Sequence, residues 1–371
     1  MGTDVVRELG AALGRGEEAV TRLGADHHQL AVPDGGFTVD ILGDPGTAHR
    51  VVHLLPGGGL NVAADFCTAQ GRSLARFLTD RGYLAVGTTP SDRADQGLDG
   101  RRADLDRVVS AATAATALPY DLLGHSAGAA LALATAAART SAEGPHRVLV
   151  LDTTGPYDPS TDPELAARAS ALTDHFAQQL AAGVRTVDPG LKALVARAAT
   201  DPTGPTALPR PTADAAPFTN LGLLHYALIH TRDLPGPANW IYHRGHSDGT
   251  YAFGPTPAED RFTLTHAPLP VWQEAIGRLG GGLQSTALLR DLAAIWAGRT
   301  DVLRIDWAAI RADVVWVNTE LGRGDHDFGP RLIREGGAAV DYRVVPGYGH
   351  GDIVWSATAE RDVWRSLLPR P

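Results

Sequence analysis

Short apolar runs recur along this chain, and segments with helical periodicity separate them. The apolar runs lie at 50–55, 83–89, 121–126, 147–154, 313–320 and 339–347. The helical segments lie at 67–82, 97–116, from about 127 to about 140, at 328–337 and at 356–369. Strands that are apolar throughout and alternate with helices are typical of a sheet buried on both faces. The pattern therefore predicts an α/β fold, with a mostly parallel sheet and helices on both faces.

The N-terminal segment departs from this rhythm. Val5, Leu9 and Leu13 recur at four-residue spacing, so residues 1–35 are expected to form a helical leader. The segment FTVDILGD at 37–44 alternates apolar and polar residues, which predicts a half-buried strand.

A long segment also interrupts the rhythm between the runs at 147–154 and 313–320. It contains predicted helices at 163–183, 220–234 and 285–298, and a proline-rich loop near the middle. A stretch of this length between successive strands is typical of a functional insertion. We therefore divide the chain into the leader 1–35, a core formed by 36–157 and 300–371, and a large helical lid insertion at 158–299.

Composition excludes several classes of function. The net charge of −9 argues against a broad basic surface for nucleic acid. A single cysteine, Cys67, excludes an internal disulfide, and no window of about 18 apolar residues predicts a membrane span. The N-terminus has no signal-peptide pattern, so a cytoplasmic protein is expected. His243 and His246 have no carboxylate or cysteine cluster beside them, so no metal or cofactor is expected.

The chemistry is indicated by Gly124-His125-Ser126-Ala127-Gly128, at the joint between an apolar run and an alanine-rich helix. This matches G-x-S-x-G, a sharp strand-to-helix turn that presents a nucleophilic serine. The context predicts that Ser126 is a nucleophile, and the alternative is a plain strand-to-helix turn. His125 occupies the variable position and is predicted to be structural.

Such a serine needs backbone N–H groups that bind the oxyanion of the reacting acyl group. The Ala127 N–H follows the serine, at the start of the helix. The glycine-rich loop LPGGGL at 55–60 predicts a second donor, from Gly57 or Gly58, because Pro56 has no N–H.

A general base and an acid complete the expected site. His350 lies between glycines after the last predicted strand and is the expected base. The acid has two candidate positions. Asp152 ends the strand that follows the nucleophile helix, whereas Glu320, Asp325 and Asp327 lie in the loop after the next strand. Both strand ends can border the histidine loop, so spacing alone leaves the alternatives open.

The segment GHSAGAALALATAAARTSAEGPHRVLVLDTTGPYD resembles the thioesterase domains of type I polyketide synthases and nonribosomal peptide synthetases. The resemblance extends to the glycine-rich loop and to VVPGYGHGDIV, and it implies an α/β-hydrolase fold. By this resemblance Ser126 is the nucleophile, Asp152 the acid and His350 the base. The substrate would be an acyl, polyketide or peptide thioester or ester, which an acyl or peptidyl carrier protein can deliver.

The chain departs from that family in three respects. We expect no attached carrier domain. The insertion is longer than in that family, and the 320–327 loop keeps carboxylates, as ordinary esterases do. The leading hypothesis is a serine thioesterase that releases its acyl chain by hydrolysis or cyclisation. The alternative is a stand-alone carboxylesterase or lipase-like hydrolase with Asp325 as the acid. A malonyl-type acyltransferase lacks support because its Phe-His-Ser motif is absent, and a catalytically silent scaffold conflicts with the complete set of residues.

Aromatic residues of the insertion could line a pocket for the acyl chain, or they could form the insertion's own core. They are Phe176, Phe218, Tyr226, Trp240, Tyr242, Tyr251 and Phe253.

Overall fold

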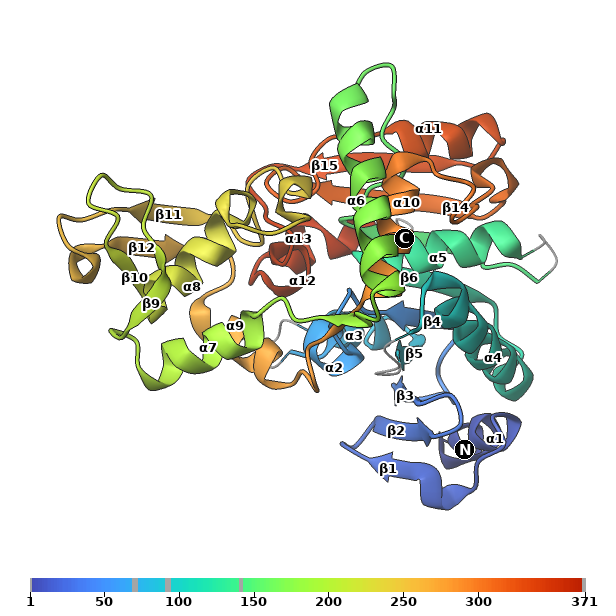
Figure 1. Ribbon diagram of the computed structural model, residues 1–371. Helices are drawn as coiled ribbons and strands as arrows, with labels where there is room; N and C mark the ends of the chain where they lie inside the picture. The colour runs from blue at the N-terminus through green and yellow to red at the C-terminus, as the bar shows by residue number, and fades with distance from the viewer. Residues whose placement is uncertain (1, 69–72, 91–94, 140–142, 369–371) are drawn as a thin grey trace.

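The computed structural model describes residues 2–68, 73–90, 95–139 and 143–368, and its centre is a nine-stranded sheet (Figure 1). In spatial order the strands are β1 (Val20–Arg22), β2 (His27–Val32), β3 (Phe37–Leu42), β5 (Tyr83–Thr89), β4 (Arg50–Leu55), β6 (Tyr120–His125), β7 (Arg147–Leu151), β14 (Asp313–Thr319) and β15 (Val340–Val345). Every pair from β5 to β15 is parallel, whereas β1, β2 and β3 join in antiparallel register. The predicted α/β class with a mostly parallel sheet is confirmed.

Helices cover both faces of this sheet. Those outside the insertion are α1 (Gly2–Ala12), α2 (Val62–Phe66), α3 (Leu74–Thr79), α4 (Leu98–Thr116), α5 (Ala127–Ala138), α11 (Phe328–Glu335), α12 (Asp352–Trp355) and α13 (Ala359–Asp362). The predicted helix at 67–82 is observed only as α3, and its residues 69–72 lie outside the described part of the chain. The predicted closing helix at 356–369 is instead divided between α13 and a 3-10 turn at Trp364–Ser366, and residue 369 is not described.

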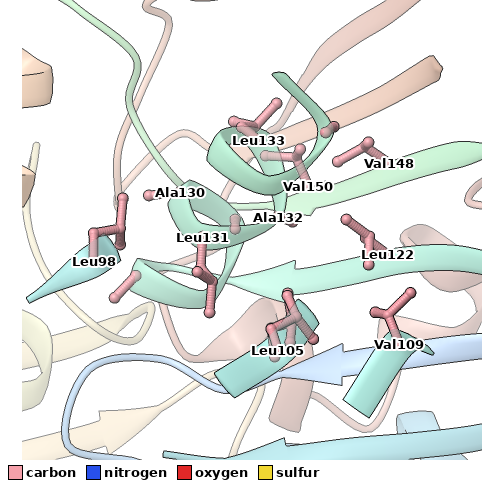
Figure 2. Packing of buried hydrophobic residues seen from close by; sticks show 14 of the residues in the cluster. Leu98, Leu105, Val109, Leu122, Ala130, Leu131, Ala132, Leu133, Val148 and Val150 are labelled. Atoms are coloured by element: carbon pink, nitrogen blue, oxygen red, sulfur yellow. The ribbon is translucent and has the colours of Figure 1, made fainter. Parts of the chain in front are cut away.

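The central strands are buried on both sides because consecutive side chains point to opposite faces. Leu122 of β6 and Val150 of β7 belong to a cluster that includes α4 and α5, part of which Figure 2 shows. Their chain neighbours Leu123 and Leu149 belong to a second cluster, which includes α2, α3, α12 and α13. Because both faces of β6 and β7 are covered by apolar clusters, these strands lack the alternation of apolar and polar residues found in β3.

The structure corrects the prediction for residues 1–35. Only α1 is helical over more than one turn, and β1 and β2 extend the sheet beyond β3. On β2 the side chains of Leu30 and Val32 are buried, while His27 and Gln29 bond to Asp40 of β3 (2.8 and 3.2 Å). The N-terminal segment is therefore part of the sheet rather than a separate leader.

The insertion is also less helical than predicted. It contains α6 (Pro163–Ala181), β8 (Thr186–Val187), α7 (Leu191–Thr200), β9 (Pro205–Pro209), β10 (Pro217–Thr219), α8 (Asn220–Ile229), β11 (Gly249–Ala252), β12 (Arg261–Leu264), α9 (Leu269–Gly277), β13 (Gln284–Ser285) and α10 (Thr286–Ala297). The short strands pair as β9 with β10, β11 with β12 and β8 with β13. Strands of two to five residues are too short to show a period, so the sequence pattern did not reveal them.

The two ends of the insertion are built into the core. α6 and α10 lie against each other, and their apolar residues belong to the same cluster as α4 and α5. The segment between them extends to one side in Figure 1. It contains α7, α8, α9 and the two-stranded sheets β9–β10 and β11–β12. The core therefore continues past the predicted boundaries at 158 and 299. In the described part of the chain no helix is long and apolar enough to cross a membrane.

Candidate active site

Ser126 lies in the sharp turn between β6 and α5, with a backbone conformation that a non-glycine residue rarely adopts (φ 55°, ψ −118°). Its N–H donates to the Leu151 carbonyl of β7 (2.9 Å), which fixes the turn against the neighbouring strand. Asp152, directly after β7, also has a positive φ of 46°. Strained backbone of this kind concentrates at functional sites, where the surrounding structure enforces it.

The glycines of the motif are required by close approach of the backbone. A Cβ on Gly124 would collide with the backbone of Gly128 and Ala129. A Cβ on Gly128 would collide with the carbonyl oxygens of Leu55 and Pro56. These contacts let α5 begin directly behind the serine.

We expect Gly128→Ala to lower the free energy of unfolding by about 3 kcal/mol, because the added methyl group meets backbone that cannot move aside. Chemical denaturation measures the loss. Gly58→Ala is the matched control, since its Cβ would have only ordinary contacts of 3.6 Å and beyond. Equal stability of the two variants would contradict the packing argument.

The structure brings His350 and Asp152 together. The Nδ1 atom of His350 lies 2.5 Å from Oδ2 of Asp152. The other oxygen, Oδ1, accepts from the Thr319 N–H at 2.7 Å, and the Arg323 N–H donates weakly to both oxygens at 3.3 Å. Asp152 is fully buried and His350 is 5% exposed. The carboxylate is therefore oriented by backbone donors and faces the imidazole directly.

The three other candidate acids have different partners. Asp325 accepts a hydrogen bond from the Tyr342 hydroxyl (3.0 Å), and Glu320 accepts one from the Gly347 N–H (2.7 Å). Asp327 pairs with Arg331 at the start of α11 (3.2 Å). Among the described residues, Asp152 is the carboxylate hydrogen-bonded to His350, so the geometry favours Asp152 over the 320–327 loop.

Burial and nearby charge set the titration of this pair. Burial raises the pKa of Asp152, while the Arg323 guanidinium and the Thr319 hydrogen bonds act to lower it. Burial, the neighbouring His125 and the Arg323 guanidinium lower the pKa of His350 well below its usual range. A neutral imidazole is the form that accepts a proton from a serine.

The Ser126 hydroxyl has no hydrogen-bond partner within the described ranges. The backbone carbonyl of His350 is contacted by His125, the residue before the serine, at 3.1 Å. The loop that carries the expected base His350, called the base loop below, therefore lies against the turn that carries Ser126. The Ser126 hydroxyl and the His350 imidazole are not hydrogen-bonded in this conformation. Catalytic hydrogen bonds are often long before substrate binds.

The oxyanion loop corrects one sequence prediction. The Gly57 N–H donates to the buried carboxylate of Asp65 on α2 (2.8 Å), so Gly57 is not a free donor. The N–H groups of Gly58 and Ala127 make no hydrogen bond within the part of the chain that the structure describes. A Cβ added to Gly58 would lie 3.6 Å from that of Ala127, so the two residues are neighbours. Gly58 and Ala127 are the pair that fits the role.

Residues of the insertion support the base loop. The His350 N–H donates to the Gly245 carbonyl (3.1 Å), and the Gly351 N–H donates to that of His246 (2.7 Å). The buried Asp352 carboxylate accepts from the Ser247 hydroxyl and the Asp248 N–H, both at 2.7 Å. The insertion thus holds the segment that carries His350, a connection that the sequence did not indicate.

Most aromatic residues proposed as pocket lining pack on other rings, and of these Phe218 and Tyr226 are buried whereas Phe253 is 38% exposed. Phe218, Tyr226, Tyr251 and Phe253 pack on one another. Trp240 packs on Tyr157 and Trp296, and Phe176 is buried in the cluster around α5.

Tyr242 is the member of that set whose ring lies beside His350 (centroids 5.3 Å apart). His246 also faces His350, at 5.6 Å between ring centroids, whereas Nε2 of His243 lies 3.4 Å from Nε2 of His326. The two histidines considered as a metal pair therefore have different neighbours.

Comparison with known proteins finds similar folds among solved structures but no match by sequence. No protein-family model and no curated protein sequence matches the chain. The fold is similar to that of a candidate lipase from Sulfolobus solfataricus, with a TM-score of 0.60, 14% identity, and 94% of this chain and 96% of that one covered.

Weaker likenesses include the thioesterase domain from the curacin biosynthetic pathway (TM-score 0.45, 15% identity, 94% and 98% covered). Another is a carboxyl esterase from Bacillus coagulans (TM-score 0.49, 13% identity, 94% of each chain). The sheet order, the serine turn after β6 and the likeness to the lipase structure together show that this chain has the α/β-hydrolase fold.

Proposed function

We propose that the protein is a serine hydrolase that cleaves acyl thioesters or esters through an acyl-enzyme on Ser126. Asp152 orients His350, and His350 serves as the general base and acid. The observation that carries the proposal is the 2.5 Å contact between buried Asp152 and His350, at the sheet edge that also bears the strained Ser126 turn.

The reaction would proceed in two halves. His350 Nε2 takes the proton as the Ser126 oxygen attacks the acyl carbonyl, and the N–H groups of Gly58 and Ala127 stabilise the oxyanion. The thiol or alcohol leaves with the proton from His350. Water, activated by the same imidazole, then hydrolyses the acyl-enzyme, or an internal hydroxyl or amine of the acyl chain attacks it and closes a ring.

A thioester substrate is the more specific part of the proposal. It rests on the resemblance of the Ser126 and Asp152 segments to thioesterase domains. The alternative is a carboxylesterase that uses Asp325 as its acid. This alternative has less support, because Asp325 accepts a hydrogen bond from the Tyr342 hydroxyl rather than from His350. Delivery by a carrier protein remains part of the proposal, although a net charge of −9 would repel an acidic carrier unless arginines cluster locally.

Treatment with a fluorophosphonate is expected to modify Ser126 in a one-to-one adduct and to inactivate hydrolysis. A serine activated by a neutral histidine displaces fluoride from the reagent, and the phosphonyl adduct mimics the tetrahedral intermediate of acyl transfer. Intact mass and peptide mapping locate the adduct.

Ser126→Ala should take up no reagent, whereas Ser160→Ala, in a loop before α6, should be labelled like the unchanged protein. An unmodified Ser126 in the folded protein would refute the proposed function. Rates of hydrolysis are then measured side by side on N-acetylcysteamine thioesters and on oxygen esters of the same acyl group. Their comparison distinguishes a thioesterase from an esterase.

A further inference from the structure

His125 lies between two hydrogen-bond acceptors in the interior of the protein. Its Nδ1 atom is 2.9 Å from Oδ1 and 3.1 Å from Oδ2 of Asp65, and its Nε2 atom is 3.1 Å from the His350 carbonyl oxygen. His125 and Asp65 are each 1% exposed. A carbonyl oxygen can only accept, so Nε2 must carry a proton.

The second ring nitrogen of His125 also carries a proton when Asp65 is ionised. The Asp65 carboxylate faces Nδ1 with both of its oxygens, and Oδ2 also accepts the Gly57 N–H at 2.8 Å. Burial acts to lower the pKa of His125, but the charge and hydrogen bond of Asp65 raise it on balance. Both ring nitrogens are then donors, and the ring is an imidazolium.

This charged ring lies beside the catalytic histidine. The ring centroids of His125 and His350 are 4.7 Å apart, with the planes tilted by 34°. His350 also faces Asp152 at the end of β7, and Tyr242 and His246 of the insertion.

Among the described residues, the other charged groups near His350 include Arg323, whose guanidinium lies over the rings of Tyr242 and Trp296, and the buried Asp352 carboxylate, which bonds to Ser247 and Asp248. Asp152 and Asp65 are the two carboxylates that contact a histidine ring here, Asp152 that of His350 and Asp65 that of His125.

We propose that Asp65 and His125 form a buried ion pair that acts on His350 as a positioning device and keeps its imidazole unprotonated. The inference rests on the proposed role of His350 as the base. The pair connects three parts of the site, because Asp65 holds the oxyanion loop at Gly57, His125 belongs to the serine turn, and its Nε2–H holds the His350 carbonyl. Protonation of His350 would place two imidazolium rings in contact, which is unfavourable.

The pH dependence of hydrolysis tests the electrostatic part. At low pH kcat/KM falls as the base of the free enzyme, here His350, becomes protonated, and this part of the pH profile is its acidic limb. Removing a neighbouring positive charge raises the pKa of that base. In Asp65→Asn the amide can accept from Gly57 and donate to Nδ1, so His125 becomes neutral and keeps its Nε2–H bond. We expect the acidic limb to move upward by about one pH unit.

His125→Gln removes the positive charge and leaves Asp65 without its partner, so the limb should move further in the same direction. The matched control is His53→Gln. His53 is another fully buried histidine, on the adjacent strand β4, and its ring nitrogens make no hydrogen bond in the described structure. Its replacement disturbs packing but should leave the limb unchanged. A limb that stays in place in Asp65→Asn and His125→Gln, or that moves equally in His53→Gln, would overturn the inference.

A second measurement does not depend on turnover. In the Ser126→Ala protein, NMR of labelled histidine rings should show His125 with both nitrogens protonated at pH 7, where an ordinary imidazole is mostly neutral. Asp65→Asn in the same background should give a neutral His125 and a His350 that titrates at higher pH. A neutral His125 at pH 7 in the unchanged pair would refute the inference even if hydrolysis is observed. Absence of hydrolysis with a protonated His125 would instead refute only the proposed function.

Discussion

Replacing Ser126 with alanine is expected to lower kcat by about 10⁶-fold on thioester and ester substrates. The change removes the Oγ atom proposed to form the acyl-enzyme, while the alanine retains the Cβ and so preserves the strained turn. Single-turnover assays with purified protein measure the residual rate, and denaturation curves check that the fold persists.

The double variant Ser126→Ala/His350→Ala provides the control for this prediction. Residues that act as one unit are strongly non-additive, so the double variant should be no slower than Ser126→Ala alone. A further large loss, or a Ser126→Ala protein with substantial turnover, would mean that His350 serves another nucleophile.

Asp152→Asn is expected to lower kcat by about 10⁴-fold. The asparagine amide cannot accept from the Nδ1–H of His350 with the same charge, so the imidazole loses its orientation and the imidazolium loses its stabilisation. Steady-state kinetics at the pH optimum measure the effect.

Asp325→Asn is the matched comparison, because it is the same substitution in the loop proposed as the alternative acid. The asparagine amide oxygen can still accept from the Tyr342 hydroxyl, so the substitution removes only the charge and should change kcat by less than about tenfold. The reverse order of the two effects would reassign the acid to the 320–327 loop.

The sequence was sufficient to predict the parts of this molecule that obey a local pattern. β4, β6 and β14 follow from apolar runs, and Ser126 follows from a motif at a recognisable strand-to-helix joint. Asp152 could be named only with the help of a resemblance, because both strand ends border the histidine loop. The hydrogen bond to His350 is an observation in favour of Asp152 that spacing alone could not provide.

Other features depend on contacts between distant residues. Asp65 and His125 are 60 positions apart, so no spacing rule connects them, and His125 alone was interpreted as a structural residue. The choice between Gly57 and Gly58 as the second oxyanion donor also depends on such a contact, because the Gly57 N–H donates to Asp65. The strands β1 and β8 are three and two residues long and gain their structure from the partners they pair with.

The hydrogen bonds between the insertion and the base loop have an evolutionary consequence. The carbonyls of Gly245 and His246 hold the backbone at 350–351, and Asp352 bonds to Ser247 and Asp248. A lineage that exchanged this insertion for another would also lose the scaffold of its histidine, and would have to rebuild both together. Selection for a new substrate is thereby tied to selection for a working base, and change in the two segments is expected to be correlated.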